Sequence, residues 1–227
     1  MMRWLQSMGP ESRSLNEIHT EFLQMLQDGR HVFDAAANAL LGGTSPDVVR
    51  KDLFATDRRI NQTEQSIRRK IVVHGALFGT STFSALLVVM SLVKDAERIG
   101  DYGKNLYDLA AAKASLGTPE RRAAMITMKD QISKLLVRAH ELYRDQDEKN
   151  ATSFMEEIRL LEDQCDDVVK EGLASSTTNA AACVLAHRYF KRVVSHAGNI
   201  ISSLLVPLDK LDYFDEPRSG GDRDLDA

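Results

Sequence analysis

The sequence has few of the residues that interrupt helices or cross-link chains. Its 227 residues include only 5 prolines, 13 glycines and 2 cysteines. So few prolines and glycines favour long helices over a protein of strands and turns. Cys165 and Cys183 belong to no Cys-x-x-Cys motif and to no His/Cys cluster, which argues against a zinc ribbon or a thiol redox motif. A reducing compartment fits this cysteine usage best.

A long hydrophobic run is also missing. The longest nearly apolar run, residues 83–93, is followed at once by Lys94 and Asp95, whereas a membrane-spanning helix needs about 20 such residues. Residues 1–12 lack the apolar core of a signal peptide. We therefore expect a cytoplasmic protein.

There is no excess of positive charge, because the formal net charge is −4. Binding to nucleic acid needs a basic surface, and the densest cationic run, residues 68–70, is short enough to be a solvated helix face. The sequence contains no P-loop, dinucleotide fingerprint or nucleophile motif. We expect neither nucleic-acid binding nor catalysis.

Hydrophobic periodicity predicts an all-α bundle. The clearest a/d seam, in which apolar and small residues alternate spacings of three and four, comprises Val89, Leu92, Ala96, Ile99, Gly103, Leu106 and Ala110. Ser14 is the expected N-cap of the first helix, residues 75–81 the expected turn after the second, and an acidic, disordered tail is expected at the end. The six predicted helices cover residues 16–41, 46–74, 82–115, 119–143, 151–172 and 179–205.

Polar stripes border the seams of the second and third helices. Glu97 and Asp101 lie four residues apart on the third helix, and Asp57, Asn61 and Glu64 share a face of the second. The short turn between these helices makes them antiparallel neighbours, so the stripes could meet. Converging carboxylates need protons or a cation, and oxygen ligands suit Mg²⁺, Ca²⁺, Mn²⁺ or iron. A pair of solvated acidic faces is the alternative that spacing alone leaves open.

Two segments carry a resemblance to a known family. Residues 95–106 read DAERIGDYGKNL and resemble the PhoU signature, approximately E-R-I-G-D-H-x-x-N-I. Residues 57–67 read DRRINQTEQSI and resemble the matching PhoU segment, approximately D-x-x-I-[DN]-x-x-E-x-x-I. Both occur in the expected order, so the chain resembles the PhoU family of phosphate-uptake regulators.

The family is built from two such repeats, and a degenerate second copy is present. Residues 191–200, KRVVSHAGNI, align with 97–106 and place Lys191 at the position of Glu97 and Ser195 at that of Asp101. On the fifth helix Glu162 aligns with Asp57, Asp166 with Asn61 and Val169 with Glu64.

The resemblance implies two tandem three-helix bundles, at residues 14–116 and 118–206, followed by a tail at 207–227. It also implies metal binding, but we predict one site rather than two, because Lys191 would place a cation in the second repeat, where it could pair with Glu162 or Asp166. This asymmetry departs from the family's pattern. The metal would be iron, manganese, magnesium or zinc, and the five implied ligands are Asp57, Asn61, Glu64, Glu97 and Asp101.

In function, the resemblance implies a cytoplasmic regulator that couples a phosphate transporter to a sensor histidine kinase. It would act by binding rather than catalysis, would reach the membrane only through its partner, and would form a homodimer. Three alternatives stay open: an accessory protein of another anion or phosphate permease, a metal-dependent hydrolase, and a purely structural helical adaptor.

Overall fold

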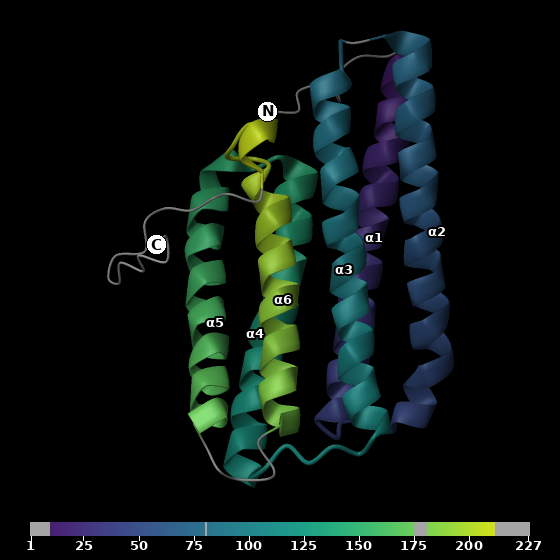
Figure 1. Ribbon diagram of the computed structural model, residues 1–227. Helices are drawn as coiled ribbons and strands as arrows, with labels where there is room; N and C mark the ends of the chain where they lie inside the picture. The colour runs from purple at the N-terminus through teal and green to yellow at the C-terminus, as the bar shows by residue number, and fades with distance from the viewer. Residues whose placement is uncertain (1–9, 80, 175–180, 212–227) are drawn as a thin grey trace, which may run out of the picture.

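A computed structural model describes residues 10–79, 81–174 and 181–211, and its long elements are all α-helices (Figure 1). Both the all-α fold and the number of long helices agree with the prediction from sequence. The six helices are α1 Pro10–Leu40, α2 Pro46–Phe78, α3 Phe83–Ala111, α4 Pro119–Asp145, α5 Glu148–Ala174 and α6 Ala181–Ser202.

The helices form two groups of three that share one hydrophobic core. Helix α1 packs against both α2 and α3, and α5 packs against α6. The two groups are joined because α3 also packs on α6 and α1 on α4. Figure 1 shows α2 and α5 as the outermost helices, on opposite sides of the bundle. The tandem three-helix arrangement therefore holds, with α1, α3, α4 and α6 between the two outer helices.

Glycines on α3 allow its neighbours to approach closely. A Cβ atom at Gly103 would lie 2.8 Å from Val32 Cγ1 and 3.1 Å from the backbone nitrogen of Phe33, both on α1. A Cβ atom at Gly100 would lie 2.9 Å from Ile60 Cδ1 on α2. Side chains on this face of α3 would therefore push the helices of the first group apart.

Several helix ends differ from the predictions. Helix α1 begins at Pro10, so Ser14 lies inside it, and its hydroxyl bonds the ring of buried His74 at 3.0 Å instead of capping the helix. Helix α2 continues to Phe78, and its C-cap is Gly79, whose φ of +80° suits glycine. Helix α3 ends at Ala111 rather than at 115.

The remaining predictions concern the fourth helix, the tail and the membrane. Thr118 caps α4, because its hydroxyl accepts a hydrogen bond from the Arg121 amide at 3.4 Å. Part of the expected tail is ordered: residues 208–210 form a 3₁₀ turn and Leu211 is buried. Residues 212–227 lie outside the described part of the chain. Among the described helices, none is both long and apolar enough to cross a bilayer.

Candidate functional site

The two polar stripes of the first repeat lie along the contact between α2 and α3. Asp57 is 8% exposed, and the other four residues are half-buried. We call this set the first-repeat acidic edge: Asp57, Asn61 and Glu64 of α2 with Glu97 and Asp101 of α3.

Lys104 connects the two sides of this edge. Its Nζ lies 2.9 Å from Asp57 Oδ1 across the helix pair and 2.8 Å from Asp101 Oδ1 on its own helix. Burial alone would lower the pKa of Lys104, but the hydrogen bonds to Asp101 and Asp57 outweigh burial and raise it above its ordinary value. The ammonium group is therefore held charged between the two carboxylates.

Glu97 has an unusual protonation equilibrium at the same edge. Burial, a hydrogen bond with Asp101 and the negative charges of Asp101 and Glu64 together raise its pKa to about 7. Near neutral pH, about half of the Glu97 carboxyl groups thus keep a proton, which is donated toward Asp101. Protonation of Glu97 reduces the repulsion among these acidic side chains.

Two arginines line the outer border of the edge. Arg98 lies 3.3 Å from Asp101 Oδ2 and 3.7 Å from Glu97 Oε2, and Arg68 lies 2.7 Å from Glu64 Oε1. Both arginine side chains are about half exposed, 50% and 48%. Water therefore screens these pairs more than it screens the pairs made by Lys104, whose side chain is 25% exposed.

The charges at this edge are balanced without a metal ion. Asp57 Oδ1 and Asp101 Oδ1 are both paired with the Lys104 ammonium, which supplies the positive charge a metal would bring. Among the described residues, no three His, Cys, Asp or Glu side chains are grouped so as to hold a metal. Metal ligation by the residues of the first-repeat acidic edge stays a prediction.

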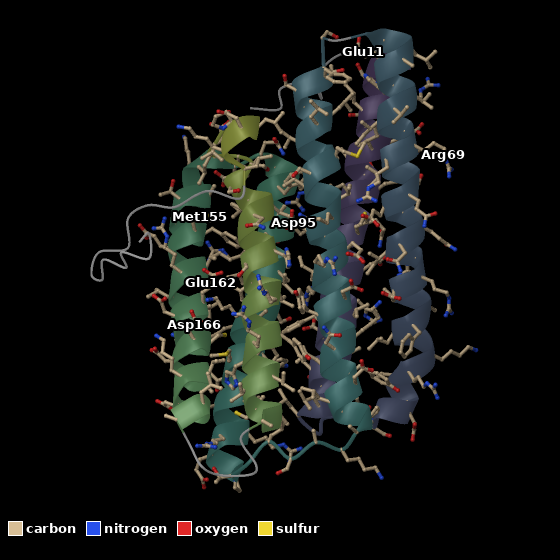
Figure 2. The ribbon with its side chains drawn as sticks, in the orientation of Figure 1. Glu11, Arg69, Asp95, Met155, Glu162 and Asp166 are labelled. Carbon is tan, nitrogen blue, oxygen red and sulfur yellow. The ribbon has the colours of Figure 1, made fainter. Side chains whose placement is uncertain are left out.

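The second repeat has a matching edge between α5 and α6, with different partners. Lys191 Nζ lies 2.5 Å from Asp166 Oδ2, and the Ser195 hydroxyl donates a hydrogen bond to Glu162. Of the two partners that the sequence left open for Lys191, the structure therefore selects Asp166. Figure 2 shows Glu162 and Asp166 one turn apart on α5. We call Glu162, Asp166, Lys191 and Ser195 the second-repeat edge.

Sequence reasoning missed a buried acid where the two repeats meet. Asp95 of α3 is 0% exposed, and its Oδ1 lies 2.7 Å from His196 Nδ1 and 2.9 Å from Asn199 Nδ2, both on α6. The ring of Tyr102 stacks on His196, with 5.7 Å between ring centroids. Figure 2 shows Asp95 in the interior of the bundle. Asp95 thus ties α3 to α6.

A second heptad stripe on α3 could have revealed this contact. Besides the seam from Val89 to Ala110, positions 88, 92, 95, 99, 102 and 106 also alternate spacings of four and three, which indicates a second packed face. Asp95 and Tyr102 lie on that stripe. A charged residue within a packed stripe indicates a buried polar contact.

Comparison with known proteins connects this fold to a family. The profile of the PhoU domain matches residues 22–110, which cover most of α1 and all of α2, and reach almost to the end of α3. No curated protein matches the chain by sequence.

Two crystal structures are similar over nearly the whole chain. PhoU from Pseudomonas aeruginosa superposes with a TM-score of 0.73 at 20% identity, covering 87% of this chain and 98% of the other. The phosphate transport system regulatory protein PhoU from Streptococcus pneumoniae gives a TM-score of 0.69 at 19% identity, covering 89% and 98%. The resemblance found in the sequence is thus confirmed: residues 22–110 match the PhoU-domain profile, and the chain has the PhoU fold along most of its length.

Proposed function

We propose that this protein regulates a phosphate transport system by binding its protein components. The observation that carries the proposal is the PhoU-domain match at residues 22–110, within a fold shared with two PhoU structures. One of these structures is described as a phosphate transport system regulatory protein. The matched residues include both segments on which the resemblance rests.

The proposed partners are subunits of a phosphate transporter and a sensor histidine kinase. The protein acts at the cytoplasmic side of the membrane through these partners, as a homodimer, and damps phosphate-starvation signalling when phosphate is plentiful. A binding role suits the chemistry of both edges, because their charged groups are paired with one another within the chain. Such pairing stabilises a surface rather than preparing a nucleophile for reaction.

The test is deletion of the gene in its own host, followed by complementation. We expect the deletion strain to express phosphate-starvation genes in phosphate-rich medium and to take up phosphate at an altered rate, and the wild-type gene to restore both. Uptake of a labelled non-phosphate anion serves as the control. Normal phosphate uptake together with normal starvation-gene expression in the deletion strain contradicts the proposal.

Affinity capture separates this function from the closest alternative. The tagged full-length chain is used to capture partners from membranes of its host, with an unrelated helical protein as the matched control. Recovery of a phosphate transporter subunit and a histidine kinase supports the proposal. Recovery of a different anion permease without any kinase favours an accessory protein of that permease.

A further inference from the structure

The first-repeat acidic edge contains a pair of like charges that share one cation. Asp57 and Asp101 approach each other from α2 and α3, and the Lys104 ammonium lies 2.9 Å and 2.8 Å from their facing oxygens. The three side chains are 12%, 26% and 25% exposed, so water screens their charges only partly. Without the ammonium, the two carboxylates would repel each other across the helix contact.

The second repeat shows what happens when this like-charge pair is absent. Glu162 stands at the position of Asp57, but Ser195 stands at that of Asp101, and its hydroxyl bonds Glu162 directly. At the position of Lys104 this repeat has Gly198, where a Cβ atom would lie 3.2 Å from Ile158 Cγ2. The lysine is thus present in the repeat with two facing carboxylates and absent from the repeat with one.

The other acidic position of the second repeat also has a cation of its own. Lys191, at the position of Glu97, lies 2.5 Å from Asp166, and these side chains are 17% and 25% exposed. The lysines of the two repeats therefore come from different positions of the motif. Each lysine reaches the edge between the middle and last helices of its own repeat.

We propose that Lys104 takes the place of a metal ion in the first repeat, so that this chain balances the charge of both edges with its own lysines and does not need a metal to fold. A divalent cation could reach Asp57 and Asp101 only if Lys104 moved away and lost both ion pairs. The ammonium also repels a second cation at this distance. The proposal concerns stability and metal content, and it does not depend on the proposed regulatory function.

The experiment measures thermal unfolding of the full-length chain with chelator and then with millimolar Mn²⁺, Mg²⁺, Zn²⁺ or Fe²⁺. We expect the wild-type midpoint to change by less than about 1 °C, since an ion that does not bind the native state does not stabilise it. A rise of several degrees with any of these ions, or a comparable fall with chelator, overturns the proposal. This part needs no variant and stays informative if a variant fails to fold.

Variants then test the lysine itself. Lys104→Met keeps most of the side-chain length and removes the charge, and we expect its midpoint to be about 3–6 °C below that of the wild type. Lys170→Met is the matched control, because the Lys170 side chain is 68% exposed and pairs only with exposed Asp167 in the described structure. Its midpoint should equal that of the wild type.

A third variant copies the second repeat. Adding Asp101→Ser to Lys104→Met removes the like-charge pair, as Ser195 does in the second repeat. The double variant should therefore recover at least half of the decrease in unfolding midpoint that Lys104→Met causes. A Lys104→Met protein as stable as the control, or a double variant no more stable than Lys104→Met, would show that Lys104 does not compensate these carboxylates.

Discussion

In the first repeat two carboxylates face each other and share one ammonium group, whereas in the second a serine hydroxyl meets a single carboxylate and a lysine pairs with a different one. Both arrangements lie between the middle and last helices of a three-helix group. The same helix contact thus accommodates opposite charges at one position, Glu97 in the first repeat and Lys191 in the second. The helix geometry at this contact therefore tolerates exchange of charge, provided that each charge has a partner.

The match to the PhoU-domain profile also distinguishes the two repeats. It matches residues 22–110 and so covers the first repeat, where the acidic motifs are intact. The structural similarity, in contrast, covers 87% to 89% of the chain. The motifs that identify the family have therefore changed in the second repeat, while the buried side chains that hold the helices together still produce the fold.

The largest effect is expected from the acid that only the first repeat possesses. Asp95 accepts bonds from His196 and Asn199, and Tyr189 stands at the matched position of the second repeat. Asp95→Ala should lower the free energy of unfolding by about 2–4 kcal/mol, because both α6 groups lose a buried partner. Urea denaturation measures this, with Asp95→Asn as the control that keeps an acceptor. Equal stability of Asp95→Ala and the wild type would show that this contact does not join the repeats.

The next effect concerns close packing. Gly103 of the first repeat aligns with Ala197 of the second, and a Cβ atom at Gly103 would lie 2.8 Å from Val32 Cγ1. We expect Gly103→Ala to lower the free energy of unfolding by about 1–3 kcal/mol through overpacking. The reciprocal change, Ala197→Gly, should lower it by about 1 kcal/mol through helix propensity and lost packing. If Gly103→Ala instead stabilises the protein, the helix approach is looser than described.

A smaller effect is expected from the lysine of the second repeat. Lys191 makes one ion pair, with Asp166, whereas Lys104 makes two. Lys191→Met should lower the free energy of unfolding by about 1–2 kcal/mol, less than Lys104→Met does, because one carboxylate rather than two loses its partner. Chemical denaturation of both variants beside Lys170→Met decides the order. A larger loss for Lys191→Met would reverse our comparison of the repeats.

The smallest predicted effect depends on pH. The pKa of Glu97 is raised from 4.5 to about 7, so the folded protein binds this proton more tightly than the unfolded chain does. The resulting stabilisation is complete below the unfolded pKa and is lost as pH rises through the folded pKa. The glutamine of Glu97→Gln does not titrate. Between about pH 5 and pH 8, the free energy of unfolding of this variant should therefore rise by about 1 kcal/mol relative to that of the wild type. This value is smaller than the full pKa shift of Glu97 would give, because solvent screens the charges.

Denaturation curves of the wild type and Glu97→Gln at several pH values test this prediction. Glu97 has no counterpart acid in the second repeat, where Lys191 stands at its position. Lys191→Met should therefore leave the pH dependence between about pH 5 and pH 8 as it is in wild type. Parallel pH profiles for wild type and Glu97→Gln would show that Glu97 is not protonated in the folded protein near neutral pH.

The fold was predictable because the a/d seams and the turn residues are local signals. Helix ends were less predictable where a distant side chain changes the role of a local residue. Ser14 has the chemistry of an N-cap, but its hydroxyl bonds His74, which lies on another helix. The sequence predicts a turn that starts at Gly75, yet α2 passes through Gly75 and ends at Phe78, with Gly79 as its C-cap.

The acidic edges were predictable in position but not in their partners. Spacing placed Asp57 and Asp101 on faces that could meet, and both contact Lys104. A flexible lysine can reach several carboxylates, so the sequence could not assign Lys104 to this pair, and for Lys191 it left two partners open. Asp95 was not predictable from the a/d seam of α3, because it lies on the second packed stripe of that helix.

Elemental analysis of the full-length wild-type protein tests most directly whether its own lysines replace a metal. The protein is purified without a tag and without chelator, and its iron, manganese, magnesium and zinc are measured by inductively coupled plasma mass spectrometry beside Lys104→Met. We predict that the wild type carries far less than a stoichiometric amount of each metal. A stoichiometric metal in the wild type that is lost on replacing Glu97 and Asp101 with alanine would contradict this account and establish the metal site that the family resemblance implies.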